Sequence, residues 1–331
     1  MDTLSTAIVV FVVSSTFVIM AGVGLARFGD ALADATGWGK LWVGTLLVGI
    51  ATSLPEVTVN VSAVWLEKNP SLALGNVFGA DMINVFVLAC VGLVFGVSNL
   101  FGNQGRDTEL LILSGLGLVI LALLFGALGD FKVLGPTSVG GLLIGAGYIY
   151  GMRLVYTAGQ VQAAQAAEAP AAPSGSVSKA WMGFGISALV VIVAGRYLAS
   201  SADAIAEASG ISATFIGVLL VSIVTTLPEG SVTVAASLRR SYGIAMGNVY
   251  GSCAFNITII SIADLFHAEG PLLREMQAAH FAAALAAFAL MALGYLVFKS
   301  YQSRAFASMR FLAPVIPIVY VGALYIVYSL G

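Results

Sequence analysis

Long apolar runs constrain the fold of this chain more than any other feature. Ten of them are long enough for a helix to cross the hydrocarbon core of a bilayer, which takes about 20 residues. Only 9% of the residues are charged, whereas soluble domains carry about 25%. The sequence therefore predicts an all-α integral membrane protein with ten transmembrane helices, at 5–27, 41–66, 72–98, 109–128, 133–157, 180–202, 212–238, 243–265, 277–298 and 310–330.

Several other protein classes are excluded by the same residues. The first apolar run follows only Asp2 and no basic segment, so we interpret it as a membrane span rather than a signal peptide. Cys90 and Cys253 both lie in apolar runs, and no disulfide framework is expected. The sequence has no basic patch of the kind that binds nucleic acid, so a nucleic-acid partner is not expected. The expected partners are the lipid bilayer and inorganic cations.

The two halves of the chain resemble each other. The first contains GTLLVGIATSLPEVTVNVSAVW and ALGNVFGADMINVFVL, and the second contains GVLLVSIVTTLPEGSVTVAASL and AMGNVYGSCAFNITII. The shared order and spacing of Thr-x-Leu-Pro-Glu and Gly-Asn-Val-x-Gly indicate an internal duplication. We divide the chain into a first five-helix repeat at 1–158 (motif 44–84), a flexible or partly helical linker at 159–179, and a second five-helix repeat at 180–331 (motif 217–256).

The repeats are predicted to have inverted topology. Five spans are an odd number, so the second repeat enters the membrane from the opposite side. With the N-terminus outside, ten of the 14 Lys and Arg residues lie inside and four lie outside, in agreement with the positive-inside rule. We therefore expect a multi-pass protein of the cell (inner) membrane with both termini outside and the linker 159–179 in the cytoplasm.

The Thr-x-Leu-Pro-Glu motif places polar groups in the middle of spans two and seven. Pro55 and Pro228 lack the backbone N–H that a helix needs, so both spans are predicted to be broken. Carbonyls freed by the break must face protein or a wet cavity. Thr52 and Glu56 are four residues apart and share one helix face. Hard oxygens of this kind suit Ca²⁺ and Na⁺ rather than zinc or copper.

The two glutamates have no basic partner in their own spans. A two-fold axis in the membrane plane would bring Glu56 and Glu229 face to face near the midplane. Two facing carboxylates repel each other unless a cation or a proton lies between them. The alternative, in which the glutamate pairs with a basic residue and the proline only kinks the helix, explains the paired motifs less well.

The second motif supplies small and amide residues. Its glycines permit close helix packing. Asn84 and Asn256 are amides deep in apolar spans, and Asp81 and Ser252 are close to them in sequence; their oxygens are candidates for a cation shell. Asn76 and Asn248 are expected to hold helix geometry instead. Neither histidine falls in a motif, since His267 is predicted in a loop and His280 near the start of span nine.

The chain resembles the cation/calcium antiporter superfamily, which includes the sodium/calcium exchangers and their prokaryotic relatives. The resemblance rests on the motifs at 44–56 and 75–84 and their copies at 225–229 and 247–256. It implies a Ca²⁺ site between the repeats with Glu56 and Glu229 as main ligands. It also implies that spans one and six, which carry Asp30 and Asp203, slide as a gate. The further cation ligands it implies are the hydroxyls of Thr52, Ser53, Thr225 and Thr226 and carbonyls near Gly49 and Ser222.

This sequence departs from the superfamily pattern at several positions. Relatives commonly have Gly-Ser-Asn where this chain has Gly79-Ala80-Asp81 and Gly251-Ser252-Cys253. Ala80 removes a hydroxyl that relatives use as a Na⁺ ligand. Asn256 stands where some relatives carry a third acid. Two interpretations stay open: Asp81 is that third carboxylate moved to the first repeat, or it only hydrogen-bonds nearby backbone.

The sequence predicts a secondary active antiporter that exchanges Ca²⁺ for Na⁺ by alternating access, functional as a monomer and without a bound cofactor. Exchange of H⁺ for Ca²⁺ or another divalent cation is the main alternative, because the same carboxylates can take protons. A cation channel is less favoured, since the acids converge on one site rather than form a ring along a pore. An enzyme is not expected, because the sequence contains no nucleophile–base pair and no histidine metal cluster.

Overall fold

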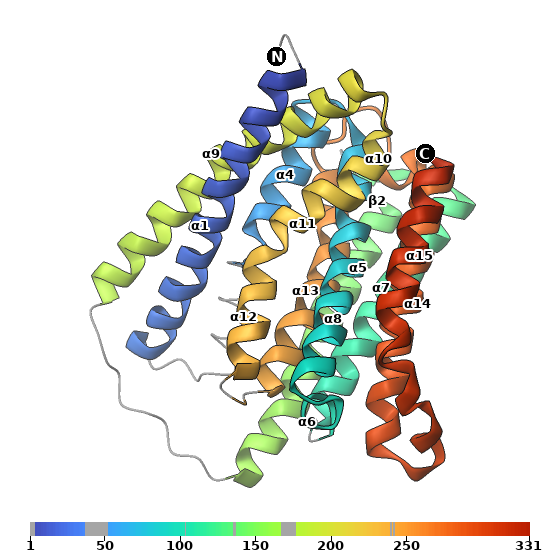
Figure 1. The fold of residues 1–331 in the computed structure, drawn as a ribbon. Coiled ribbons are helices and arrows are strands. Elements are labelled where there is room, and N and C mark those ends of the chain that lie inside the picture. Colours follow the sequence, from blue (N-terminus) through green and yellow to red (C-terminus); the bar gives the residue numbers. More distant parts are fainter. Residues whose placement is uncertain are drawn as a thin grey trace.

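The described part of the chain folds into a bundle of long helices with one short β-hairpin (Figure 1). The computed structural model describes residues 4–36, 52–102, 104–134, 137–166, 177–238, 240 and 242–331. Within these residues seven helices are long and apolar enough to cross a membrane, or nine spans if each of two bent helix pairs counts as one. The first part of the predicted span 41–66 lies outside the described residues.

The first half contains six helices and the hairpin among its described residues. The elements are α1 (Leu4–Thr36), α4 (Leu54–Trp65), α5 (Pro70–Phe95), α6 (Val97–Phe101), α7 (Arg106–Leu128), antiparallel strands β1 (Lys132–Leu134) and β2 (Thr137–Ser138), and α8 (Val139–Ala166). The prediction of a helix from residue 133 was wrong, because the helix begins only at Val139. Asp130 explains the late start: its carboxylate accepts hydrogen bonds from the backbone N–H of Phe131 (2.8 Å) and Gly140 (3.0 Å) and so caps α8.

The second half begins with a long helix and continues through a broken one. Its elements are α9 (Val177–Ser209), α10 (Ala213–Ile216), the π-helix η2 (Gly217–Val221), α11 (Ser222–Thr225), α12 (Leu227–Leu238), α13 (Tyr242–Asp264), the 3₁₀-helices η3 (Leu272–Glu275) and η4 (Arg304–Leu312), α14 (Ala278–Gln302) and α15 (Val315–Leu330). The predicted last span, 310–330, starts within η4, and η4 and α15 are bent by 52° at Pro314. Helices α8 and α9 extend into the predicted linker from both sides.

Helices α5 and α13 form the centre of the bundle. In the most apolar window of each, 72% of α5 and 67% of α13 is buried, against 22% for α8 and α9. Glycines allow α5 to touch the broken helix: a Cβ on Gly75 would lie 2.4 Å from the carbonyl oxygen of Thr214, and one on Gly79 would lie 2.5 Å from the Cα of Val218. The two backbones are therefore in direct contact, as small residues permit in membrane bundles.

The matching glycines of the second repeat make no such close contact with the described residues. A Cβ on Gly247 or Gly251 would meet no atom of the described residues within 4 Å. The offset of 173 that relates Gly44 to Gly217 pairs Thr214 with residue 41 and Val218 with residue 45. Both of those positions lie outside the described residues.

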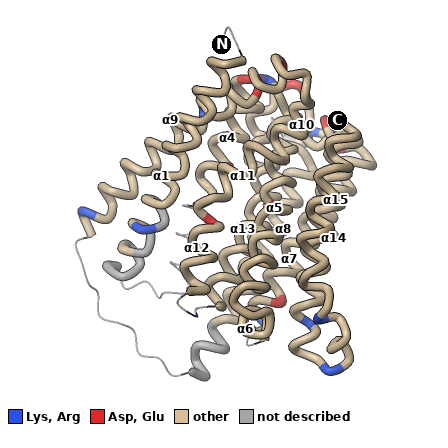
Figure 2. The backbone as a smooth tube through the Cα atoms, in the orientation of Figure 1, with Lys and Arg blue, Asp and Glu red and all other residues tan. Residues whose placement is uncertain are grey.

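Helices α1 and α9 lie side by side at one edge of the bundle and run in opposite directions (Figure 1). One polar contact ties α9 to the central helices, because the Asn69 side-chain amide donates to the Asp203 carboxylate. Asn69 also caps α5, because its side-chain oxygen accepts from the N–H of Leu72 (3.0 Å). Pro70 follows it as the first residue of the helix, a position that proline favours. The side chain of Asp30 is outside the described part of the structure. Charged residues lie mainly at the two ends of the bundle (Figure 2).

Both histidines lie where the sequence predicts. His267 follows α13 in a loop, where its Nδ1 lies 2.8 Å from the carbonyl of Gly270. His280 is buried in the first turn of α14, and its Nδ1 accepts from the N–H of Gln277 (2.9 Å). The other ring nitrogen, Nε2, then carries the proton and lies 3.1 Å from the carbonyl of Ser71 and 2.9 Å from the hydroxyl of Thr214. His280 thus joins the starts of α5 and α10, one from each repeat.

Candidate cation site

The Thr-x-Leu-Pro-Glu motif of the second repeat, at 225–229, forms a bend between two helices. Helix α11 ends at Thr225, and α12 begins at Leu227 with Pro228 in its first turn. The segments Ala213–Thr225 and Leu227–Leu238 are bent by 47°. Thr226 bridges the break, because both its N–H (3.0 Å) and its hydroxyl (2.6 Å) donate to the carbonyl of Ser222. A proline has no N–H to continue the ladder, which accounts for the bend at this place.

Each motif glutamate lies in the first turn of a half-helix. Glu56 follows Pro55 at the start of α4, and Glu229 follows Pro228 at the start of α12. The unpaired N–H groups at a helix N-terminus favour negative charge. The backbone carbonyl of each glutamate accepts a hydrogen bond from the side chain four residues later. Asn60 Nδ2 donates to the backbone carbonyl of Glu56 (2.7 Å), and Thr233 Oγ1 donates to that of Glu229 (2.8 Å).

Sequence reasoning missed this last pair. Asn60 and Thr233 are fully buried and occupy equivalent places in the duplication. The signal was present in the sequence, since both are polar residues one helical turn beyond the glutamate inside an apolar run. Asn248 adds a further support, because its amide donates to the carbonyl of Glu229 (2.9 Å) and to Thr233 Oγ1 (3.0 Å). Its contacts agree with the geometric role expected from sequence.

The structure brings the two motifs together. Ser53 Oγ donates to Glu229 Oε1 at 3.3 Å, which links residues from different repeats. The contacts are reciprocal, because the Thr52 hydroxyl lies beside the Glu229 carboxylate and the Thr225 hydroxyl beside the Glu56 carboxylate. The two carboxylates are close enough to repel each other electrostatically. All of these side chains are buried, with at most 1% of the surface of each glutamate exposed.

The negative charge of this pair is not balanced by the protein residues that are described. Both Glu56 oxygens and Glu229 Oε2 are buried with no hydrogen-bond partner among those residues. An ion pair between described residues lies elsewhere in the chain and joins Lys299 and Glu109, at 2.5 Å. Uncompensated buried carboxylates are costly. The arrangement can be neutralised chemically by cations with a preference for oxygen ligands or by protons.

A second polar cluster joins the same two repeats. Asn256 Nδ2 donates to Asp81 Oδ1 at 3.0 Å, and Cys253 Sγ donates weakly to the Asp81 carbonyl at 3.9 Å. Asn84 and Ser252 are buried nearby in the chain, and neither the Asn84 amide nitrogen nor the Ser252 hydroxyl has a hydrogen-bond partner among the described residues. No group of three or more His, Cys, Asp or Glu side chains converges as a metal site within the described ranges. Asp81 is therefore paired with an amide rather than clustered with both glutamates.

The predicted carbonyl ligands lie near Gly49 and Ser222. Gly49 lies outside the described residues. The Ser222 carbonyl accepts the two bonds from Thr226 described above, and its own hydroxyl donates to the carbonyl of Val218. Ser222 is fully buried, so its carbonyl belongs to the polar interior of the bend.

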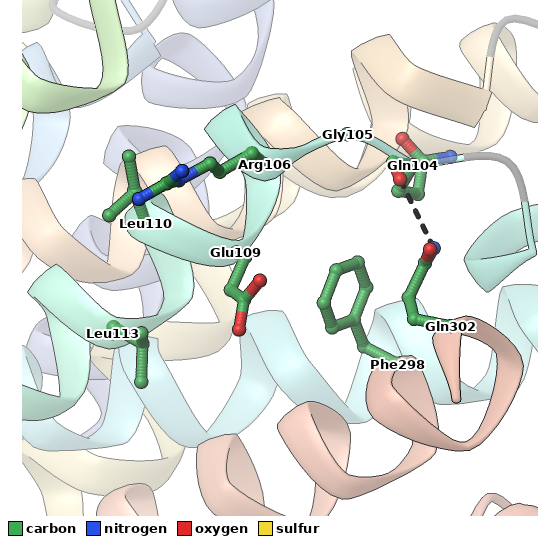
Figure 3. Close-up of a pocket in the computed structure, with 8 residues that line it drawn as sticks. All are labelled: Gln104, Gly105, Arg106, Glu109, Leu110, Leu113, Phe298 and Gln302. Carbon is green, nitrogen blue, oxygen red and sulfur yellow. Dashed lines mark hydrogen bonds between the residues drawn. The ribbon is translucent and has the colours of Figure 1, made fainter. Parts of the chain in front are cut away.

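An open cavity lies elsewhere and contains none of the predicted ligands. Its volume is about 460 Å³, and it lies between the start of α7 and the end of α14, where Gln302 Nε2 donates to the carbonyl of Gln104 at 3.1 Å (Figure 3). Arg106, Glu109 and Phe298 contribute to its walls. The candidate cation site is thus a closed, polar interior cluster and not the open cavity.

Known proteins resemble this chain in sequence and in fold. Residues 6–155 and 179–329 match the family described as sodium/calcium exchanger protein. The inner membrane protein YrbG of Escherichia coli is 28% identical over 77% of this chain and 78% of its own length. The sodium/calcium exchanger MaX1 of Methanosarcina acetivorans is 24% identical over 76% of this chain and 80% of its own. The crystal structure of the H⁺/Ca²⁺ exchanger CAX has the same fold, with a TM-score of 0.68, 13% identity and coverage of 98% of this chain and 88% of that one. Because the family match covers both halves, the chain belongs to the sodium/calcium exchanger family of the cation/calcium antiporter superfamily.

Proposed function

We propose that this protein is a secondary active antiporter that moves Ca²⁺ out of the cell in exchange for Na⁺. The observation that carries the proposal is the pair of buried carboxylates, Glu56 and Glu229, which come from different repeats and lack a basic partner among the described residues. A single Ca²⁺ or several Na⁺ ions neutralise this pair, but not both at once. Crossing with an empty site would leave the charges in a low dielectric, and this couples the two fluxes.

We infer a ten-span arrangement of two inverted five-helix repeats, with spans two and seven broken at the motif prolines. The opposite directions of α1 and α9 (Figure 1) and the reciprocal contacts of Thr52 and Thr225 support the inversion. Helices α1 and α9 are the proposed sliding pair, since they pack on each other at the edge of the bundle. The contact of Asn69 with Asp203 would then be one that sliding breaks and re-forms.

The proposed cation ligands are the glutamates, the neighbouring hydroxyls and the amides of the second motif. Glu56 and Glu229 supply the charge for Ca²⁺, which takes six to eight oxygen ligands. The remaining oxygens would come from side chains and backbone around the two bends: Thr52, Ser53, Thr225, Thr226, Asn84, Asn256, Ser252, Asp81 and carbonyls near Gly49 and Ser222. The cations are cargo, and no cofactor is part of the proposal.

A second candidate, exchange of H⁺ for Ca²⁺, is favoured by two observations. Ala80 lacks the hydroxyl that the superfamily resemblance assigns to Na⁺. The fold is also similar to that of a structure described as an H⁺/Ca²⁺ exchanger. The buried carboxylates can take protons as well as sodium ions. We keep Na⁺ as the first choice on the resemblance of the paired motifs.

The experiment is uptake of radioactive Ca²⁺ into proteoliposomes, first with an imposed Na⁺ gradient and then with a pH gradient. We expect uptake with the Na⁺ gradient and its loss in the double variant Glu56→Gln, Glu229→Gln. Glu109→Gln is the matched control, because Glu109 lies in the open cavity outside the site and should leave transport unchanged. Uptake that ignores both gradients, or that survives the double substitution, would refute an antiporter built on this carboxylate pair.

The position in the membrane and the oligomeric state are also proposals. We propose an inner-membrane protein that works as a monomer, with both termini outside and the segment 159–179 in the cytoplasm. Cysteine labelling from each side of intact cells, at single cysteines placed in that segment and near the C-terminus, tests the orientation. Labelling of the segment from outside would reverse the proposed topology.

A further inference from the structure

A buried thiol lies beside the second polar cluster. Cys253 on α13 is fully buried, and its Sγ lies 3.9 Å from the carbonyl oxygen of Asp81 on α5. The thiol also lies beside the Asp81 carboxylate. It occupies a position where relatives of the superfamily commonly have an oxygen or amide side chain. A thiol is therefore placed between the two repeats, next to the Asp81 carboxylate.

The oxygens around this thiol have unused acceptor capacity. Asp81 Oδ1 accepts from Asn256, but Asp81 Oδ2 is buried without a partner among the described residues. The amide oxygen of Asn256 is likewise buried and without a partner in that part of the chain. Both residues have at most 1% of their surface exposed. A carboxylate and a thiol thus meet across two helices, and the amide of Asn256 is hydrogen-bonded to the same carboxylate.

We propose that Asp81, Asn256 and Cys253 form a second cation site, selective for a soft divalent metal ion such as Cd²⁺. Sulfur ligands select soft cations, whereas Ca²⁺ is bound by oxygen alone. On binding, the thiol loses its proton to the solution and becomes a thiolate. The thiolate and the Asp81 carboxylate then carry two negative charges, which balance one divalent ion. The remaining metal positions are left to water or to another group.

The site deepens the proposed function by naming a second class of cation for the same pathway. Its existence rests on the proposed function only in the way the ion arrives, because a fully buried site must open to one side of the membrane before a metal can enter. Binding itself can be measured on the purified protein without any gradient. A failure of binding and a failure of antiport are therefore distinguishable.

The test uses the thiolate-to-metal charge-transfer absorption of Cd²⁺ in the ultraviolet, recorded on purified full-length protein. The chain has two cysteines, and Cys90 on α5 is the half-buried one, which makes Cys90→Ser a matched control. We expect the band in the wild type and in C90S, and its loss in both C253S and C253A. We also expect Asp81→Asn to weaken Cd²⁺ binding by at least about tenfold, as loss of a metal-site group does.

Two absorption results would overturn the proposal. One is a wild-type protein that gives no band, and the other is a band that persists in C253S or disappears in C90S. The two Cys253 variants guard against a folding defect in either one, and each is compared with the wild type by its elution from size-exclusion chromatography. In proteoliposomes, Cd²⁺ should inhibit Ca²⁺ uptake by the wild type and by C90S far more strongly than by C253S. Equal inhibition of all three would also contradict a thiol site.

Discussion

Replacing Glu56 with glutamine should stabilise the protein in the absence of cations and remove its response to Ca²⁺. Both Glu56 oxygens are buried without a hydrogen-bond partner among the described residues, and the nearby Glu229 carboxylate repels them. A buried unsatisfied polar group costs about 1–3 kcal/mol, and a charged one costs more. Glu56→Gln removes the charge and keeps the shape. We expect a gain of at least about 1 kcal/mol in the free energy of unfolding in cation-free buffer.

The response to Ca²⁺ should change in the opposite direction. A ligand that binds only the folded state stabilises it by about 2.7 kcal/mol at a concentration of 100 times its dissociation constant. The wild type should therefore unfold at a higher temperature in Ca²⁺ than in chelator. Glu56→Gln removes a proposed main ligand, so this difference should shrink or vanish. The variant is then more stable than the wild type in chelator and gains little from Ca²⁺, a trade of function for stability.

The assay is thermal unfolding in detergent, followed by tryptophan fluorescence with chelator and with Ca²⁺. Glu109→Gln is the control, because it breaks the ion pair with Lys299. The side chains of Lys299 and Glu109 are 27% and 26% exposed. An exposed pair of this kind contributes at most about 1 kcal/mol, so this variant should be slightly destabilised and keep the full response to Ca²⁺. A Glu56→Gln variant that is less stable than the wild type in chelator, or that retains the full Ca²⁺ response, would refute the reasoning.

Three further substitutions probe other parts of the molecule. Asp264→Ala should destabilise the fold by about 3–6 kcal/mol. Its buried carboxylate accepts from the N–H groups of Ser138 (2.9 Å) and Leu272 (2.7 Å), and each such bond to a charged group contributes about 1.5–3 kcal/mol. A loss below about 1 kcal/mol in the free energy of unfolding, measured by denaturant titration, would contradict this. Burial and the neighbouring Asp203 raise the pKa of Glu67, which lies between α4 and α5. The fold therefore disfavours the ionised form of Glu67, and Glu67→Gln should stabilise the protein at a pH above the raised pKa, by under about 1 kcal/mol after screening. This gain should disappear as the pH falls below 4.5, the ordinary pKa of the group. An equal gain above the raised pKa and below 4.5 would count against the prediction. Asp81→Asn should leave Glu56-dependent Ca²⁺ binding in place and change the charge moved per Ca²⁺ if Asp81 is the third carboxylate; an unchanged current ratio would make Asp81 a structural residue.

The repeated motifs could be predicted because their signal is local. A proline followed by a glutamate inside an apolar run carries its meaning in a few residues, and two copies of it specify the pairing of Glu56 with Glu229. The hairpin at 132–138 was not predictable in the same way, because hydropathy cannot distinguish Val133 and Leu134 in a strand from the same residues in a helix. The helix start there is set by Asp130, whose carboxylate bonds Gly140 ten residues away.

Side-chain contacts between segments that are distant in the sequence could not be predicted either. The amide of Asn69 reaches Asp203, and His280 reaches Thr214, across separations that no periodic pattern encodes. The ends of α1 and α9 extend past the predicted spans for a related reason. Both helices continue through charged and small residues, such as Asp30 and Asp203, which a hydropathy criterion treats as the edge of the membrane. Helix length in these places follows from packing of the two helices on each other.

The departures from the superfamily pattern are concentrated at one contact between the repeats. The acid that some relatives carry at position 256 is an asparagine here, and its amide bonds Asp81 across the interface. A carboxylate facing a carboxylate would repel, whereas a carboxylate facing an amide donor is stabilised, so an acid at 81 is compatible with an amide at 256 in a way that two acids are not. On the proposed function, the exchange of acid and amide between the repeats keeps one negative charge at this contact while leaving the pair of Glu56 and Glu229 unchanged. The balance of charge that couples two ion fluxes can therefore survive a substitution that changes which repeat carries the acid, and Cys253 beside it changes which cations that acid attracts.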